Sequence, residues 1–237
     1  MQMAYYVGRQ QGFDLGGVGE HFYIESVTHA DMQRLENALN AVIQRHEMLR
    51  AVFTDDGRQR VLPEVPRYTV DVKDLRCASD SEISEATMRE REALSHECFD
   101  LGTWPLFRLQ AHALPDGTHR LFFSIDMIIG DGASQRIFIK DLARAYRGEE
   151  LPPVAGSYRD HVIAIKRIQD QNRANAYSSE IKRMMEEFPL GNVLPANTSV
   201  VARPHMRRMS WDVFEDLVEK IRSYAAQQGV SLSTVLL

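Results

Sequence analysis

The chain has 237 residues and a mass of 27.1 kDa, which suits one large lobe or two small ones. Hydrophobic residues make up 44% and charged residues 26% of the chain, which argues against intrinsic disorder, collagen-like structure and a coiled coil. The 28 Lys and Arg residues against 33 Asp and Glu residues give a net charge of −5, without the basic excess of domains that grip a phosphate backbone. We therefore expect no nucleic-acid partner.

Several classes of site and location lack a sequence signal. Cys77 and Cys98 form no CxxC pair, so we expect neither a disulfide framework nor a zinc cage. Apolar runs such as 121–125 are too short to cross a bilayer, and residues 1–11 do not resemble a signal peptide. Phosphate-loop, strand-linked GxGxxG and GxSxG motifs are missing, and the histidines show no metal-binding pattern. We expect a cytoplasmic protein with no membrane partner, and no cofactor or metal bound by this chain.

The first part of the chain alternates strand and helix signals. Residues 20–27 are rich in aromatic and β-branched side chains, which is typical of a strand. Apolar residues at helical spacing follow over 32–43, and Thr28 with Asp31 forms the predicted N-cap pair of this helix. Extended character resumes at 52–53, so the order is strand, helix, strand.

The middle of the chain predicts a strand, a helix and a hairpin. Residues 68–72 alternate as a short strand, and 81–99 predict a surface helix. The inward-facing side chains expected on that helix are Ile83, Ala86, Ala93, Leu94 and Cys98. Strands at 106–114 and 119–127 flank the turn triplet 115–117 and predict the hairpin. The second strand is almost wholly apolar, so we expect it to be central and buried on both faces.

The last part of the chain is mainly helical. Residues 133–147 predict a helix, and 157–188 predict one or two charged amphipathic helices with a break within 172–175. The remaining predicted elements are a linker at 189–197, an extended segment at 199–210 and an amphipathic helix at 211–228 ended by Gly229. Ser231 resembles the N-cap of one more helix, so we expect the chain to stop within an element and to be a piece of a longer polypeptide.

Two carboxylates and a hydroxyl, those of Asp126, Asp131 and Ser134, follow the end of the buried strand. An unpaired carboxylate buried there would cost several kcal/mol, on the order of the penalty for any lone buried charge, so Asp126 is either solvated at a cleft or buried with partners. Asp131 and Ser134 lie where ordinary helix caps also occur. Residue chemistry alone therefore leaves a functional site and plain capping both open.

Three short motifs occur in order along nearly the whole chain. They are QxAYxxGR, carried by Gln2, Ala4, Tyr5, Gly8 and Arg9; RHxMLRxxF, carried by Arg45, His46, Met48, Leu49, Arg50 and Phe53; and DxxxxDxxS, carried by Asp126, Asp131 and Ser134. Together they resemble the heterocyclization domains of nonribosomal peptide synthetases, a branch of the condensation-domain superfamily. The proline-rich element of these domains is only faintly echoed at 188–195.

The resemblance implies an α/β fold like that of chloramphenicol acetyltransferase, with a mixed sheet and flanking helices, truncated before most of its second lobe. It divides the chain into an N-terminal lobe at 1–188, a linker at 189–198 and the incomplete start of a C-terminal lobe at 199–237. In the family, the missing lobe supplies a catalytic aspartate and a polar partner. We therefore expect the isolated piece to be inactive.

The activity implied by the resemblance joins a carrier-bound acyl thioester to carrier-bound cysteine, serine or threonine, and then closes a thiazoline or oxazoline ring with loss of water. Such rings occur in secondary metabolites, siderophores among them. The implied partners are the upstream and downstream peptidyl or aryl carrier domains and an adjacent adenylation domain. The phosphopantetheine arms that hold the substrates belong to the carriers.

The resemblance also implies roles for individual residues. Asp126, Asp131 and Ser134 are the catalytic candidates, with Asp131 expected to shape the cleft floor through an ion pair with an arginine, or else to serve architecture alone. Substrate binding falls to Tyr5, Gly8, Arg9 and Met127, although the first three could equally form a packed N-terminal strand and turn. Met127 cannot accept a proton, which excludes histidine-based acyl transfer at that position.

Two other functions stay open. A degenerate, non-catalytic module that only docks carriers or neighbouring enzymes would also fit the weak proline-rich element. A simple condensation domain that makes an amide without ring closure is disfavoured by Met127.

Overall fold

The computed structural model describes residues 2–9, 18–172, 177–187 and 212–236. Within it, the chain divides into two compact units, residues 1–204 and residues 205–237. The linker predicted at 189–197 and the extended segment predicted at 199–210 lie outside the described residues.

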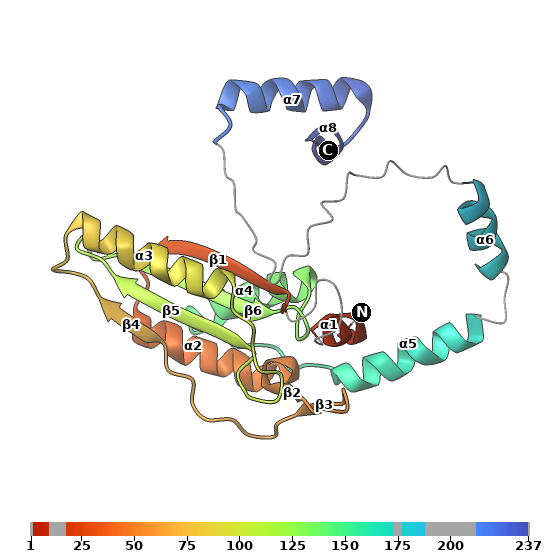
Figure 1. Cartoon of the computed structure of the whole chain (residues 1–237), viewed down its shortest axis with the longest axis horizontal. Helices are drawn as coiled ribbons and strands as arrows, with labels where there is room; N and C mark the ends of the chain where they lie inside the picture. Colours follow the sequence, from red (N-terminus) through yellow and green to blue (C-terminus); the bar gives the residue numbers. More distant parts are fainter. Residues whose placement is uncertain (1, 10–17, 173–176, 188–211, 237) are drawn as a thin grey trace, which may run out of the picture. The chain divides into compact units, whose positions relative to one another are not determined.

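A four-stranded mixed sheet forms the centre of the first unit (Figure 1). Its strands are β1 (His21–Thr28), β4 (Asp71–Asp74), β5 (Phe107–Ala113) and β6 (His119–Asp126). The strand order is β1-β6-β5-β4, in which β4 runs parallel to β5 and the other neighbours are antiparallel. The predicted hairpin is confirmed, with Gly117 at a φ of 78° in its turn, and its second strand is central as expected.

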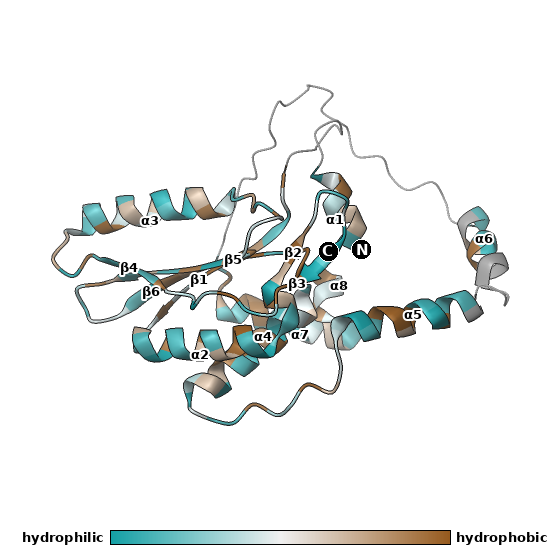
Figure 2. Cartoon of the chain, turned by 90° about the horizontal axis from the view of Figure 1, so that it is seen from below, coloured by the Kyte–Doolittle hydropathy of each residue, from teal (hydrophilic) through white to brown (hydrophobic). Residues whose placement is uncertain are grey.

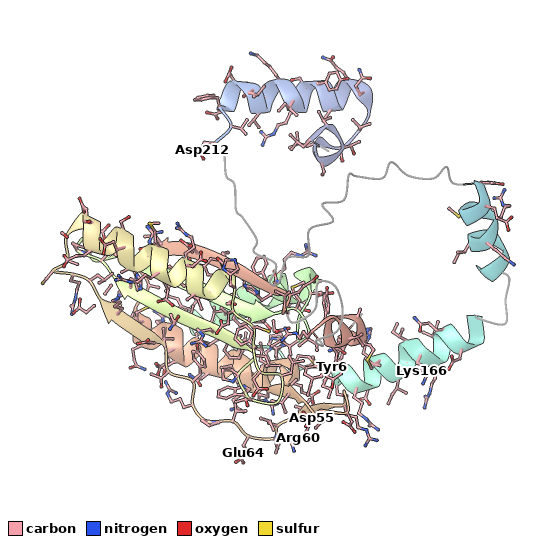
Figure 3. All side chains as sticks on the ribbon, viewed as in Figure 1. Tyr6, Asp55, Arg60, Glu64, Lys166 and Asp212 are labelled. Atoms are coloured by element: carbon pink, nitrogen blue, oxygen red, sulfur yellow. The ribbon has the colours of Figure 1, made fainter. Side chains whose placement is uncertain are left out.

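A second, two-stranded sheet lies beside a short helical turn. Strand β2 (Ala51–Phe53) pairs with β3 (Gln59–Val61), and η1 (Glu47–Arg50) precedes them. Tyr6 lies beside Asp55 at the turn between the two strands, and its hydroxyl donates a hydrogen bond of 2.6 Å to the Asp55 carbonyl oxygen (Figure 3). The N-terminal segment is thereby attached to this turn.

Helices cover both faces of the main sheet (Figure 2). Helix α3 (Asp80–Ser95) lies on one face, and α2 (Met32–Arg45) and α4 (Gly132–Tyr146) lie on the other. Phe123 of β6 stacks on Phe138 of α4 with 5.0 Å between ring centroids, which fixes the face that the odd-numbered residues of β6 present. Because side chains alternate along a strand, the even-numbered residues of β6 face α3.

The apolar core lies on the α2 and α4 side of the sheet. Its largest side chains form an aromatic cluster in which Phe107 packs on Tyr68 and Trp104, with ring centroids 5.2 Å and 6.2 Å away. The indole of Trp104 donates to the carbonyl oxygen of Leu49 at 2.9 Å, so this tryptophan serves packing.

Several predicted boundaries were wrong for local reasons. Asp31 alone is the N-cap of α2, accepting from the Arg34 amide at 2.7 Å, while Thr28 accepts from the Ala30 amide before the helix begins. Ala93 and Cys98, both predicted to face inward, are exposed: Ala93 lies within α3 on its solvent side, and Cys98 lies beyond the end of α3 at Ser95. The strand predicted at 68–72 forms three residues later, as β4.

Three further helices of the first unit are α1, α5 and α6. The N-terminal strand offered as an alternative is wrong, because Gln2–Gly8 form helix α1. The helices predicted over 157–188 appear as α5 (Tyr158–Asn172) and α6 (Tyr177–Glu187).

The second unit holds two helices. They are α7 (Glu215–Gln228), whose cap residue Gly229 has a φ of 65°, and α8 (Leu232–Leu236), whose Thr234 amide donates to the predicted N-cap Ser231 at 3.2 Å. Across the described parts of both units, no helix is long and apolar enough to cross a membrane.

A buried carboxylate joins α2 to α4. Asp141 of α4 accepts hydrogen bonds of 2.9 Å from Arg45 Nε and from His46 Nε2 at the end of α2, and Arg45 also donates to the Pro152 carbonyl oxygen. Burial acts to raise the pKa of Asp141, but the bonds from His46 and Arg45 outweigh it and hold the pKa below its usual value. The charge on Asp141 thus connects three segments, the end of α2, helix α4 and the turn at Pro152.

Replacing Asp141 by alanine is expected to lower the free energy of unfolding by about 2 kcal/mol, since it leaves two partly buried donors, Arg45 and His46, without their shared acceptor. Urea denaturation measures the change. Asp74→Ala is the matched control, because it breaks an ion pair with Arg76 that is solvent-exposed and should leave the midpoint unchanged. Equal midpoints for both variants would contradict the role of Asp141.

The burial of His112 predicts that the stability of the fold depends on pH. It is 2% exposed, its ring lies 4.6 Å from that of Phe122, and its Nε2 is 3.9 Å from the Glu90 carboxylate of α3. Burial, with smaller contributions from Lys73 and Arg120, lowers the pKa of His112 below its ordinary value of 6.5. The unfolded chain therefore binds a proton at a higher pH than the folded chain, and stability falls as the pH drops below 6.5.

His112→Phe keeps the ring contact and removes the titration, so its stability should decline less than that of the parent below pH 6.5. Thermal unfolding across this range measures the slope. His29→Phe, at an exposed position, should keep the slope of the parent protein. A parent-like slope in the His112 variant would refute the assignment.

Candidate functional site

The end of the central strand β6 carries a buried ion pair. Asp126 is fully buried, its Oδ2 accepts from Arg9 Nη2, and its Oδ1 accepts a 3.0 Å hydrogen bond from the Ile128 amide. Burial raises the pKa of Asp126 and outweighs the opposing attraction of Arg9 and the bond from Ile128. Of the alternatives left open by the sequence, Asp126 is buried with partners.

Arg9 reaches this carboxylate from the N-terminal helix. Helix α1 ends at Gly8, and the Arg9 side chain is only 10% exposed, with Nη1 donating to the Phe99 carbonyl oxygen at 3.0 Å. A Cβ at Gly19 would lie 2.6 Å from Arg9 Nη2, so the guanidinium can occupy this place only because Gly19 has no side chain. Gly8 itself is exposed.

Asp131 and Ser134 form the N-terminal cap of α4. Asp131 Oδ1 accepts from the Ser134 amide at 2.8 Å and from the Ser134 hydroxyl at 2.7 Å, and these bonds lower the pKa of Asp131. Among the described residues no arginine pairs with Asp131, and its observed bonds are those of a helix cap, which is the purely architectural alternative. Arg9 pairs instead with Asp126, because Asp126 is removed from water and requires a counter-charge.

A cavity of about 310 Å³ lies at the same end of β6, on the α4 side of the sheet. We call it the β6–α4 cavity and define it by the residues that line it: Gln2, Tyr5, His46, Met48, Leu49, Ile125, Met127, Ile128, Ile129, Gly130, Asp131, Ser134, Gln135, Ile137, Phe138 and Tyr158. These come from α1, the α2–η1 junction, η1, the end of β6, the turn 127–131, α4 and the start of α5. Most of the wall is therefore apolar.

Polar groups at the edge of this cavity are largely engaged with one another. Gln2 Nε2 donates to the Ile128 carbonyl oxygen at 2.8 Å, and the Tyr158 hydroxyl donates to Gln2 Oε1 at 3.3 Å. His46 is held through its Nε2 by Asp141, and Gln135 Nε2 lies 3.5 Å from the sulfur of Met127. These contacts attach α1 and α5 to the turn that follows β6.

The sequence-predicted residues fall into two groups. Tyr5, Met127, Asp131 and Ser134 line the cavity, whereas Gly8, Arg9 and Asp126 do not. Strand alternation explains the place of Asp126, because Ile125 faces the cavity and Asp126 faces the opposite side of the sheet.

Sequence reasoning assigned no site role to the cavity residues His46 and Gln135. His46 belongs to the RHxMLRxxF motif, which was the signal available for it, and it is also the C-cap of α2. Gln135 directly follows the DxxxxDxxS motif, and this position was the signal available for it. Among the described residues, no group of three His, Cys, Asp or Glu side chains could hold a metal ion.

Comparisons with known proteins identify relatives for most of the chain. The phenyloxazoline synthase MbtB of Mycolicibacterium paratuberculosis is 36% identical over 89% of this chain, which covers 18% of that protein. The pyochelin synthetase PchE of Pseudomonas aeruginosa is 33% identical over 99% of this chain and 17% of that protein. The chain thus spans less than a fifth of the length of these two relatives.

Solved structures agree with these matches. The cyclization-docking bidomain of the nonribosomal peptide synthetase EpoB from Sorangium cellulosum superposes with a TM-score of 0.78 and 29% identity, over 96% of this chain and 47% of that one. The sequence model of the Condensation domain matches residues 17–237. The chain belongs to the condensation-domain family.

Proposed function

We propose that this chain is part of a heterocyclization domain of a nonribosomal peptide synthetase. The observation that carries the proposal is the end of β6, where Asp126 of the DxxxxDxxS motif is paired with Arg9 and Met127 offers no proton acceptor. The kinship with a phenyloxazoline synthase and with a cyclization domain supports it.

The proposed reaction has two steps. The amine of a carrier-bound cysteine, serine or threonine attacks the carbonyl of an acyl thioester, the C–S bond breaks, and the released thiol takes the proton. The side-chain sulfur or oxygen then attacks the new amide carbon, the C–O bond breaks, and water leaves as the ring closes. Because Met127 offers no proton acceptor, alignment of amine and carbonyl at about 3 to 3.5 Å carries much of the first step.

Asp126 acts in this proposal as a positioning residue. Its carboxylate is enclosed, and its Oδ1 accepts from the Ile128 amide, which orders the turn that carries Met127 into the cavity. Asp131 and Ser134 start α4 and set the rim of the same cavity. Tyr5 forms part of the cavity wall. Arg9 pairs with Asp126, and Gly8 is the last residue of the helix that precedes Arg9.

The proposed partners are the carrier domains on either side and a neighbouring adenylation domain. Both substrates would arrive on phosphopantetheine arms, so the chain itself needs only to bind acyl and aminoacyl groups. The lining residues contain no Lys or Arg that would hold a free phosphate, which supports delivery on a carrier.

The direct test supplies the full synthetase that contains this domain with one acyl-loaded carrier and one cysteine-loaded carrier. Mass spectrometry of the released product should show the amide minus one water. An amide that keeps this water would favour a simple condensation domain, and carrier binding without any product would favour a docking module. Either result would overturn the proposal.

A pair of isosteric substitutions separates the two aspartates. Asp126→Asn removes the charge opposite buried Arg9 and is expected to lower kcat/KM by about tenfold or more. Asp131→Asn preserves an N-cap acceptor, because asparagine caps helices as well as aspartate does, and should stay within about twofold of the parent.

Steady-state kinetics of ring formation measures both effects, with the melting temperature of each variant as the control for folding. A larger loss at Asp131 than at Asp126 would show that the rim carboxylate, and not the buried one, governs the reaction.

A further inference from the structure

We infer that the β6–α4 cavity binds the acyl group of the donor thioester, and that this group is uncharged, predominantly apolar and about the size of one aromatic ring. The inference rests on the proposed function, and it concerns a choice of substrate that neither the family nor its motifs determine.

The wall of the cavity sets the polarity of its ligand. Apolar side chains line most of it, including the polarizable sulfur-containing residues Met48 and Met127 and the ring of Phe138. None of the lining residues is Lys or Arg, and the rim carboxylate of Asp131 already accepts two bonds from Ser134. A charged acyl group would lose its hydration here without gaining a counter-ion, which costs several kcal/mol, on the order of the penalty for an unpaired buried charge.

The polar groups at the edge do not offset this cost. The amide of Gln2 is shared between Ile128 and Tyr158, and the imidazole of His46 is bonded to Asp141. Because these groups already have hydrogen-bond partners, a polar ligand atom would gain little binding free energy from them. The cavity therefore selects by shape and burial of apolar surface.

The volume limits the size of the acyl group. About 310 Å³ lies at the lower end of the range, roughly 300–1,000 Å³, of pockets that enclose small molecules. One aromatic ring or a branched aliphatic group of similar bulk fills this space, and most of a long peptidyl chain would have to lie outside it.

The acceptor is the less suitable occupant. Its thiol or hydroxyl must stay at the reacting carbon, and its remaining side-chain surface is too small to benefit from an apolar pocket of this size. The donor acyl group carries no reacting atom beyond its carbonyl, so the rest of it is free to be buried. Burial of the donor would hold its carbonyl beside the turn of Met127.

The test compares donors of similar bulk on the same carrier, with the full synthetase and cysteine as acceptor. Benzoyl and isovaleryl groups should be transferred with a kcat/KM at least about tenfold above that of succinyl, since tenfold corresponds to only about 1.4 kcal/mol of the expected desolvation cost. Equal or better use of succinyl would overturn the inference.

The measured quantity is the total product, that is, the uncyclised amide plus the cyclised ring. If amide forms with a clear donor preference but no ring closes, the proposed function fails and the inference about the cavity stands. If rings form from charged and apolar donors alike, the function stands and the inference fails.

A matched pair of variants on α4 locates the preference. Ile137 and Ile139 are 53% and 51% exposed, two residues apart, and only Ile137 lines the cavity. Ile137→Glu places a carboxylate at the rim and should reduce the use of benzoyl donors by about tenfold. Ile139→Glu should leave donor preference unchanged, and equal effects of the two substitutions would show that the donor binds elsewhere.

Discussion

Asp126 and Arg9 are 117 residues apart in sequence, and their ion pair is the contact through which the N-terminal helix meets the central strand of the sheet. Neither group could be buried alone, because each would lose hydration without compensation. Gly19 leaves room for the guanidinium, since a Cβ there would lie 2.6 Å from Arg9 Nη2, and Asp126 Oδ1 remains available to accept from the Ile128 amide. One buried pair thus fixes the start of the chain and the turn after β6.

The alternation of side chains along β6 divides two tasks between the faces of the sheet. Asp126 points to the α3 side, where it is satisfied by Arg9, while Ile125 points to the α4 side and lines the cavity. The charged group that shapes the turn therefore lies outside the apolar space in which we place the acyl group. This division lets a buried carboxylate order the site without adding its charge to the ligand pocket.

Turns and helix caps, which involve neighbouring residues, could be predicted from the sequence, whereas partners distant in sequence could not. Gly117 and its neighbours encode a turn within three residues, and the cap formed by Asp131 spans one helical turn, so both could be predicted. The partner of Asp126, Arg9, lies on a different element 117 residues away, so the sequence pattern did not identify it. Cys98 was assigned to a helix face because the apolar period continues beyond Ser95, where the helix ends. The motifs indicated where the site lies, but the cavity could not be predicted because it is formed by the packing of elements that are distant in sequence.

Asp141 completes the site from the side opposite Asp126. By binding Arg45 and His46 at the end of α2, it fixes the imidazole that lines the cavity and also holds the carbonyl of Pro152 within reach of Arg45. The residues after Pro152 lead into α5, whose first residue, Tyr158, reaches the cavity through Gln2. Two buried aspartates, one on each side of the cavity, therefore hold its walls by charge, which leaves the walls themselves free to be apolar. A site built in this way gains its selectivity from the absence of free charge inside and its geometry from paired charge outside.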